Sequence, residues 1–292
     1  AEAVRRFLAE TGENADAIDV IGFHGQTVLH RPDKALTVQI GDGGLLADIT
    51  GINVIYDLRA NDMVHGGQGA PLVPVYHQAL VAGQKSDGIT AFVNIGGIAN
   101  VTFVGGGNPV AFDTGPGNAL IDQWVQANAG IPFDDGGRIA SEGVVDDARV
   151  TAFLDHDYFR RKLPKSLDRN DFSPDLVAGM ELSDGARTLA AMTARSILGS
   201  AIHAQGKISR WIICGGGRRN AAIMAELSAG AKYAEVIVAE DAGFDGGAME
   251  AEAWAYLAVR SLKNLPITFP ETTGVKEPVT GGILCHPKQE TA

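Results

Sequence analysis

The sequence predicts an α/β fold with two domains and mixed sheets. Strand-like apolar runs alternate with helix-like segments over most of the chain, which is typical of α/β architecture. Two β-rich runs around Gly96 and Gly97 predict a hairpin, so at least one sheet contains antiparallel strands. A length of 292 residues fits two domains better than one. Both halves place glycines directly after strands, so we expect a ligand-binding cleft beyond the carboxyl ends of the strands, between the domains.

The first half is expected to alternate short strands and helices. Residues 18–25 (IDVIGFHG) form a continuous apolar run that ends in glycine, which predicts a buried strand. Residues 71–82 carry proline in what would be the first turn of a helix. The elements expected in this half are helices at 1–9, 44–50 and 71–82 and strands at 18–25, 37–41 and 52–57.

The middle of the chain begins with the hairpin, at 90–104, and the second half is again regular. Residues 131–180 are rich in Asp, Arg and Pro and predict an irregular insertion, either a mobile lobe or a surface segment. The other elements expected are strands at 109–115, 210–217 and 234–240 and helices at 118–130, 186–206, 220–231 and 247–262. We expect an N-terminal domain at 1–108 and a C-terminal domain at 109–292, which contains the insertion.

Composition excludes several classes of function. The net charge of −11 repels phosphate backbones, so nucleic acid is not an expected partner. Cys214 and Cys285 do not make a disulfide framework, which favours a reducing cytoplasm. No apolar run approaches the roughly 20 residues that cross a bilayer, and residues 1–10 lack the apolar stretch of a signal peptide. We expect a cytoplasmic protein that does not contact membranes.

Three strands run directly into glycines, which let backbone N–H groups approach an anion. None of these segments matches GxxxxGK[ST], and none forms GxGxxG after a strand. Each one alone is equally well explained as a tight turn. Together they favour a phosphate-binding cleft of another type. The segments are GGQGAP at 66–71, IGGIAN at 95–100 and CGGGRRN at 214–220.

Two carboxylates are candidates for chemistry. Asp113 lies where the apolar run PVAF breaks into TGPGN, a position suited to a general base or a metal ligand. The alternative for Asp113 is a cap that satisfies backbone N–H groups in the turn. Glu250 stands in the first turn of the last long helix, where the helix dipole favours an anion. The same position also favours an acidic residue for stability alone.

Candidate substrate-binding residues follow two other strands. His24 lies with Gln26 and Thr27 in FHGQT, where hydroxyl binding competes with a purely structural role for the histidine. Arg59 follows Asp57 in YDLRAND and could hold a carboxylate with its two-pronged guanidinium, or form an ordinary surface ion pair. Motifs of the types GxSxG, CxxC and HExxH are absent, and the histidine spacing matches no common zinc site, so no structural metal is expected.

These segments, in this order, resemble the anhydro-N-acetylmuramic acid kinase family of the actin/hexokinase/Hsp70 superfamily. The resemblance runs from residue 18 to about 262, and FDTGPGN (112–118), NIGGIANV (94–101) and GGQGAPLVP (66–74) are its most specific parts. It implies an actin-like (ribonuclease H-like) fold in two domains. Members of the family open with a phosphate loop, GTSxDG, that this sequence does not contain, so we expect the N-terminal hairpin to be missing.

The resemblance also implies a reaction and a set of site residues. ATP, with Mg²⁺, and water would convert 1,6-anhydro-N-acetylmuramic acid into N-acetylmuramic acid 6-phosphate and ADP, in the recycling of peptidoglycan. Asp113 would be the catalytic base and Glu250 its acidic helper. The nucleotide would contact Gly96, Gly97, Asn100, Gly215, Gly216, Gly217 and Asn220. The sugar would contact His24, Gln26, Thr27, Asp57, Arg59, Gln68 and Gly69.

Two other functions stay open from the sequence. One is a kinase of the same superfamily that phosphorylates an ordinary hexose hydroxyl, with Asp113 deprotonating that hydroxyl. The other is an actin-like scaffold, or a protein that binds the sugar without turnover. The sequence does not fix the oligomeric state and allows a homodimer.

Overall fold

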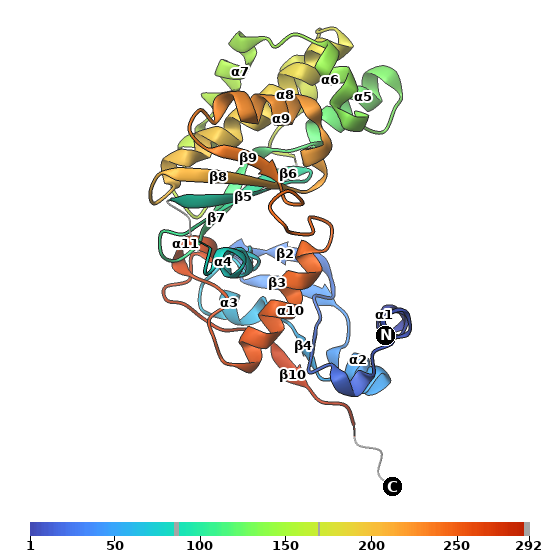
Figure 1. The fold of residues 1–292 in the computed structure, drawn as a ribbon. Helices are drawn as coiled ribbons and strands as arrows, with labels where there is room; N and C mark the ends of the chain where they lie inside the picture. Colours follow the sequence, from blue (N-terminus) through green and yellow to red (C-terminus); the bar gives the residue numbers. More distant parts are fainter. Residues whose placement is uncertain (85–87, 169, 289–292) are drawn as a thin grey trace. The chain divides into compact units, whose positions relative to one another are not determined.

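The computed structural model of the chain describes residues 1–84, 88–168 and 170–288 and divides into two compact units (Figure 1). Unit 1 is built from Ala1–Ala79 and Ala248–Ala292, and unit 2 from Leu80–Gly247. The predicted domain boundary at 108/109 falls between two neighbouring strands of one sheet in unit 2. The units therefore divide the chain at other points, because the last long helix returns to the N-terminal unit.

Unit 2 contains a five-stranded mixed sheet with the order β7-β6-β5-β8-β9. The first three strands in sequence form an antiparallel meander, and β8 and β9 extend the sheet in parallel from β5. This arrangement confirms the expected α/β class with a mixed sheet and the hairpin around the Gly-Gly turn. The strands are β5 (Ile89–Ile95), β6 (Ile98–Val104), β7 (Val110–Pro116), β8 (Ile208–Cys214) and β9 (Glu235–Val238).

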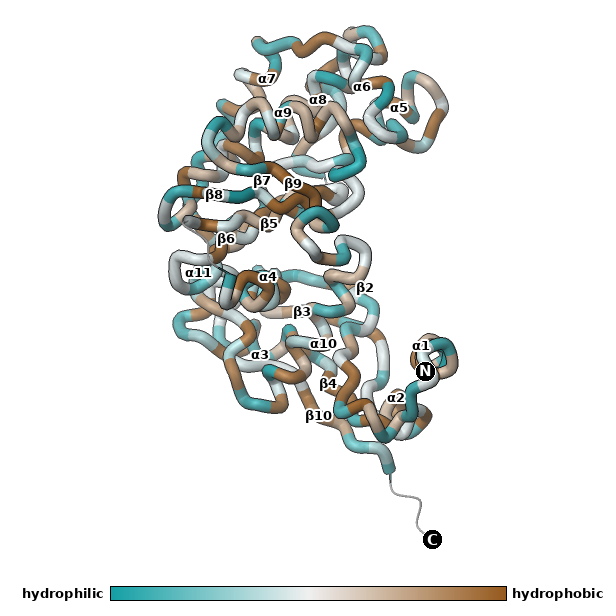
Figure 2. The backbone as a smooth tube through the Cα atoms, in the orientation of Figure 1, coloured by the Kyte–Doolittle hydropathy of each residue, from teal (hydrophilic) through white to brown (hydrophobic). Residues whose placement is uncertain are grey.

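Burial of the sheet explains its composition. All residues of β5 except Asn94 are buried, and Figure 2 shows apolar residues along this strand and β9. Helix α8 (Leu182–Gly199) buries a row of small side chains that includes Ala186, Ala190 and Ala194, which allows close packing in the core. The neighbouring helices are α5 (Ala119–Ala129) and α9 (Ala221–Gly230).

The segment 131–180 contributes to the core of unit 2. The Asp134 carboxylate accepts hydrogen bonds from the backbone N–H groups of Ile139 and Ala140, at 2.8 and 3.0 Å, and so fixes the start of the next helix. Phe153 and Tyr158 are buried. The segment thus places short helices against the sheet and α8. They are η3 (Asp135–Gly137), α6 (Arg138–Glu142), α7 (Asp147–Leu154), η4 (Asp157–Arg160) and η5 (Pro174–Val177).

Unit 1 contains a three-stranded sheet, a two-stranded ribbon and several helices. The sheet has the order β1-β4-β10, and the ribbon pairs β2 with β3. Helix α10 passes so close to β1 that a Cβ on Gly22 would lie 2.1 Å from the Trp254 carbonyl oxygen, which requires glycine there. The strands are β1 (Ile21–Gly22), β2 (Gln26–Arg31), β3 (Leu36–Ile40), β4 (Val54–Tyr56) and β10 (Ile283–Cys285). The helices are α1 (Glu2–Thr11), η1 (Ala15–Ala17), η2 (Pro32–Lys34), α2 (Gly43–Thr50), α3 (Ala60–Val64), α4 (Pro74–Val81, which starts in this unit), α10 (Met249–Leu262) and α11 (Pro270–Thr273).

The ribbon corrects one prediction from the sequence. The strand expected at 18–25 is limited to Ile21 and Gly22, and the chain after Gly25 forms β2, which the sequence analysis did not predict. The other strand, β3, lies where a strand was expected at 37–41. The ribbon is inverted: the polar residues of β3 are half-buried, while its apolar residues, like Val28 and Leu29 of β2, are exposed. An apolar-in rule therefore assigns the wrong face.

A buried carboxylate joins distant segments of unit 1. Asp62 is 1% exposed, and its carboxylate accepts hydrogen bonds from the Gly69 N–H and the Thr273 hydroxyl, both at 2.6 Å. The contact therefore holds the loop after α3 against α11. Within the described residues, no helix is long and apolar enough to cross a membrane.

Replacement of Asp62 by alanine is expected to lower the free energy of unfolding by about 3 kcal/mol, because it leaves a buried backbone donor and a buried hydroxyl without their acceptor. Urea denaturation measures the change. Asp33→Ala, which removes an exposed carboxylate paired with Arg31, is the control and should have no measurable effect. Equal stability of Asp62→Ala and the unaltered protein would show that Asp62 does not hold this loop.

Candidate functional site

Asp113 is held by the segment that follows η4. Its carboxylate Oδ2 accepts a hydrogen bond from the Leu167 backbone N–H at 2.9 Å, and its own N–H donates to the Lys165 carbonyl at 3.5 Å. The Tyr158 hydroxyl donates to the Asp113 carbonyl. Burial raises the pKa of Asp113 to about 6, and the hydrogen bond from Leu167 acts in the opposite direction. A carboxylate with this pKa can accept a proton near neutral pH.

The side chain of Asp113 belongs to a polar row across an apolar sheet. The register pairs Asn94 with Asn100 and Asn100 with Asp113, so all three side chains lie on the same face. Directly opposed residues have Cβ atoms about 5 Å apart, which brings these groups within reach of one ligand. Asn94 was not predicted as a site residue, although its place two residues before the Gly-Gly turn was a usable signal.

The Gly96-Gly97 turn packs against the start of α5. The carbonyl of Gly96 accepts a hydrogen bond from the Asn118 N–H at 2.7 Å, and that of Gly97 accepts one from the Gly117 N–H at 2.9 Å. A Cβ on Gly117 would lie 2.2 Å from the Gly96 carbonyl oxygen, so this close approach requires glycine. The two glycine segments therefore form one compact backbone surface at the end of the meander.

The CGGG segment follows β8 at the neighbouring strand end. Gly215 has a positive φ of 74°, and a Cβ there would lie 2.4 Å from the Asn94 side-chain oxygen. Gly217 is buried against Ile95, and Gly216 begins a short 3₁₀ turn. The Asn220 side chain accepts hydrogen bonds from the N–H groups of residues 222 and 223, so its oxygen caps α9.

In unit 1, Arg59 is the centre of a small cluster. Its Nη1 donates to the Gly69 carbonyl at 2.7 Å, and its Nη2 donates to His24 Nε2 at 3.0 Å. Because arginine can only donate, His24 is neutral with its proton on Nδ1, which donates to the Gly25 carbonyl at 2.8 Å. The Arg59 guanidinium also lies over the Trp254 ring, 5.7 Å from its centroid.

The charge of Arg59 is only distantly compensated. Among the described residues, no carboxylate lies within 4.0 Å of its nitrogens, and its buried Nε has no hydrogen-bond partner. Burial lowers the pKa of Arg59, while the negative charges of Glu250 and Asp62 act against that shift. Burial and the charge of Arg59 also lower the pKa of His24. Glu250 is exposed in the first turn of α10.

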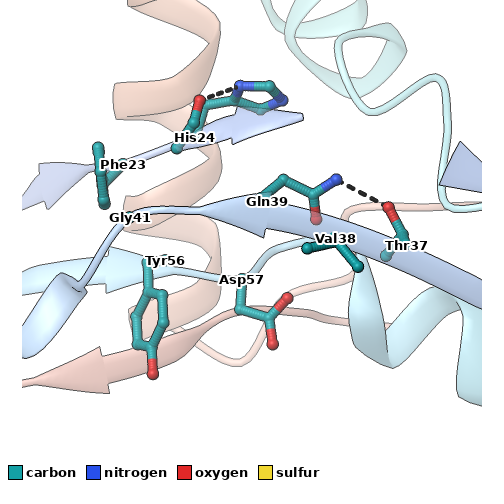
Figure 3. Close-up of a pocket in the computed structure, with 9 residues that line it drawn as sticks. Phe23, His24, Thr37, Val38, Gln39, Gly41, Tyr56 and Asp57 are labelled. Atoms are coloured by element: carbon teal, nitrogen blue, oxygen red, sulfur yellow. Dashed lines mark hydrogen bonds between the residues drawn. The ribbon is translucent and has the colours of Figure 1, made fainter. Parts of the chain in front are cut away.

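A pocket of about 220 Å³ lies beside this cluster (Figure 3). Asp57 points into it from a backbone with a positive φ of 53°, and burial raises the pKa of its carboxyl. No described residue donates a hydrogen bond to that carboxylate. The other lining residues are Phe23, His24, Gly25, Thr37, Val38, Gln39, Gly41 and Tyr56.

The remaining predicted sugar residues have different surroundings. Gln26 is exposed, and Thr27 accepts a hydrogen bond from Gln39 at 3.2 Å. The Gln68 backbone N–H donates to the Thr273 carbonyl at 2.8 Å. Gly69 connects Asp62 to Arg59 through its N–H and its carbonyl. The structure thus brings His24, Arg59 and Gly69 into direct contact within unit 1.

Comparison with known proteins decides the family. The family model described as anhydro-N-acetylmuramic acid kinase matches residues 1–287. The chain belongs to this family. A protein of that name from Agrobacterium fabrum is 58% identical over 97% of this chain and 78% of its own length. One from Brucella canis is 55% identical over 98% of this chain and 78% of its own length.

Solved structures give weaker similarity. The activator of the 2-hydroxyisocaproyl-CoA dehydratase from Clostridium difficile, with bound ADPNP, is 15% identical with a TM-score of 0.39, over 63% of this chain and 67% of its own. Membership of the anhydro-N-acetylmuramic acid kinase family therefore rests on the sequence matches alone.

Sequence analysis missed the residues that hold Asp113. Tyr158 and Leu167 lie 45 and 54 positions from it in the chain, within the segment expected to be irregular. No motif connects them to Asp113, so no local signal could have found them. Asp62 lies inside the motif YDLRAND, where its proximity to Asp57 and Arg59 was a signal, and Gln39 lies in the strand expected at 37–41.

The raised pKa of Asp113 predicts that replacing this residue by asparagine stabilises the folded protein at neutral pH. The folded pKa is about 6, above that of an unfolded aspartate, so ionisation destabilises the fold as pH rises through that range. Asp113→Asn is therefore expected to raise the free energy of unfolding by about 2 kcal/mol at pH 7.5 and to leave it unchanged at pH 3.5.

Urea denaturation of both proteins at the two pH values measures this difference. Asp241→Asn, which neutralises an exposed carboxylate of the same unit, is the matched control and should show no pH-dependent gain. An equal increase in the free energy of unfolding at both pH values would show that ionisation of Asp113 does not destabilise the fold.

Proposed function

We propose that this protein uses ATP and water to convert 1,6-anhydro-N-acetylmuramic acid into N-acetylmuramic acid 6-phosphate and ADP. The observation that carries the proposal is the half-buried Asp113 carboxylate, with its pKa raised to about 6, in a chain that belongs to this kinase family. The setting would be peptidoglycan recycling in the cytoplasm. Two cysteines, Cys214 and Cys285, do not make a disulfide framework, which fits a reducing compartment.

In this proposal Asp113 is the base that activates water. It accepts a proton as the water oxygen attacks the anomeric carbon C1 of the sugar. The bond between C1 and the bridging 6-oxygen breaks, and its electron pair stays on that oxygen. The 6-oxygen attacks the γ-phosphorus, and ADP leaves. Because the phosphoryl group captures the leaving oxygen, no second carboxylic acid is needed to protonate it.

Glycine-rich backbone surfaces of unit 2 would hold the nucleotide. The carbonyls of Gly96 and Gly97 are used inside the unit, which leaves the N–H groups of the turn for phosphate oxygens. Asn100 lies on the same face as Asp113 and would contact the transferred group. Gly215 and its neighbours, Gly216 and Gly217, would lie on the adenosine side. Asn220 would act there through its position at the start of α9, because its oxygen already caps that helix.

Mg²⁺ would be held mainly by the nucleotide itself. The described part of the chain contains no group of three or more His, Cys, Asp or Glu side chains that could hold a metal ion. Mg²⁺ commonly binds proteins through one or two carboxylates together with substrate phosphates, so this absence fits a kinase. When bound, the ion offsets the negative charge of the phosphates during transfer.

Arg59 would bind the lactyl carboxylate of the muramic group. It is a half-buried cation without a close protein carboxylate among the described residues, which is the environment expected of an anion-binding group. His24 has both ring nitrogens engaged and would orient Arg59, and Glu250 would assist from the start of α10. Asp57, Gln26, Thr27, Gln68 and Gly69 would complete the sugar site.

Asp113→Asn is expected to abolish phosphorylation of the anhydro-sugar while sugar affinity stays within about tenfold, because the change is isosteric and removes the base. Product formation is measured in a coupled ADP assay and sugar affinity by calorimetry. Glucose offered in parallel tests the hexose kinase alternative. Turnover of the variant at the rate of the unaltered protein would show that Asp113 is not the base. Phosphorylation of glucose in place of the anhydro-sugar would contradict the proposed substrate.

Arg59→Ala is expected to weaken binding of anhydro-N-acetylmuramic acid by about 2 kcal/mol or more, since it removes a buried charge-assisted pair. Anhydro-N-acetylglucosamine, which lacks the lactyl carboxylate, should lose much less. ATP affinity serves as the control and should be unchanged. Equal losses for the two sugars would assign Arg59 a structural role.

A further inference from the structure

The ribbon β2–β3 turns a polar face towards the pocket beside Asp57. The register pairs Thr27 with Gln39 and His30 with Thr37, and a shift after Thr27 keeps all four side chains on one face. These four residues are half-buried. Of the four, Thr37 and Gln39 line the pocket (Figure 3). A polar face turned inward has a cost in folding, so its hydrogen bonds need an explanation.

A chain of hydrogen bonds fixes the direction of the Gln39 amide. Burial and the charge of Arg59 lower the pKa of His30, so its ring is neutral, and its Nδ1 lies 3.0 Å from the Thr37 hydroxyl oxygen. A neutral ring can accept the proton of the Thr37 hydroxyl at Nδ1. The Thr37 hydroxyl oxygen accepts a hydrogen bond from Gln39, because the Gln39 atom that lies 2.7 Å away is the amide nitrogen.

The second hydrogen on that nitrogen goes to the Thr27 hydroxyl, at 3.2 Å. Both donors of the Gln39 amide are then used inside the ribbon, and its carbonyl oxygen is left as the group that a ligand can reach. No described residue donates to this oxygen. Figure 3 shows the amide nitrogen directed to Thr37 and the oxygen on its other side.

The pocket thus offers hydrogen-bond acceptors next to apolar surface. Asp57 contributes a carboxylate and Gln39 a fixed carbonyl, while Phe23, Val38 and Tyr56 supply apolar atoms. A sugar hydroxyl would use only a hydrogen-bond acceptor of this pocket. An acetamido group would use both an acceptor and the apolar surface, since its N–H donates a hydrogen bond and its methyl group packs on apolar atoms.

We propose that Gln39 accepts a hydrogen bond from the acetamido N–H of the anhydro-sugar and so selects N-acetylated sugars. This inference rests on the proposed function and adds a specificity residue to it. Asp57 then takes the neighbouring sugar hydroxyl, and Thr27 and Thr37 hold the Gln39 amide in its reading position. The polar groups on this face, which are costly to bury, thus have a role: they fix the direction of the Gln39 carbonyl.

The test compares 1,6-anhydro-N-acetylglucosamine with 1,6-anhydroglucose, two sugars that differ in the acetamido group and both lack the lactyl carboxylate. Affinities are measured by NMR titration, which covers millimolar dissociation constants, for the unaltered protein and for Gln39→Leu. The variant is expected to bind the acetamido sugar about tenfold more weakly and anhydroglucose within about twofold, because one neutral hydrogen bond is lost. Equal losses for the two sugars would overturn the assignment of Gln39.

Thr37→Val is the second variant, and it decides the question if Gln39→Leu does not fold. It keeps the Gln39 carbonyl and the shape of the side chain but releases the amide, so discrimination between the two sugars should fall by about threefold. Unchanged discrimination would overturn the proposal. Binding of anhydro-N-acetylmuramic acid by the unaltered protein is measured first. If this sugar does not bind, the proposed function itself is contradicted. If it binds but Gln39→Leu leaves the ratio of the affinities for the two test sugars unchanged, only this inference is contradicted.

Discussion

The hydrogen bond from the Leu167 backbone N–H to the Asp113 carboxylate is the interaction on which the proposed chemistry depends. Burial alone drives this carboxyl towards its protonated form, in which it cannot act as a base. One N–H donor favours the ionised form and fixes one oxygen. That donor belongs to the segment 131–180, so the packing of a segment that carries no catalytic motif affects the pKa of the Asp113 carboxyl.

Unit 1 shows the same relation between packing and polar chemistry. The buried Asp62 holds Gly69, the Gly69 carbonyl holds Arg59, and Arg59 fixes the tautomer of His24. A parallel chain through His30 and Thr37 fixes Gln39. The first series of hydrogen bonds leaves the charge of Arg59 without a nearby carboxylate among the described residues. The second leaves the Gln39 carbonyl oxygen without a donor among them. Such groups are costly in an empty site and suit a ligand that supplies what is missing.

The sequence predicted the α/β class, the hairpin around Gly96, and the strand that carries Asp113, because these features depend on local apolar runs and turn residues. The family resemblance also assigned Arg59 and His24 to one expected sugar site, and the structure places the two side chains in contact. Sequence analysis predicted one strand of the ribbon, at 37–41, but not its partner β2, in which Val28 and Leu29 are 56% and 40% exposed. It also did not find Tyr158 and Leu167, which contact Asp113 from 45 and 54 positions away in the chain. Tertiary packing determines which face of the ribbon is buried and which residues contact Asp113, and neither can be read from a local sequence pattern.

The most direct measurement of the central claim follows the Asp113 carboxyl itself. A protein labelled with ¹³C at aspartate carboxyl groups is titrated by NMR, with Asp113 assigned from its asparagine variant, and the pH dependence of kcat/KM is recorded on the same preparation. The two curves should share one apparent pKa, at about 6, with activity lost as pH falls below it. An Asp113 carboxyl that titrates near 4, or an acid limb of the rate that follows a different pKa, would contradict the assignment of this residue as the base.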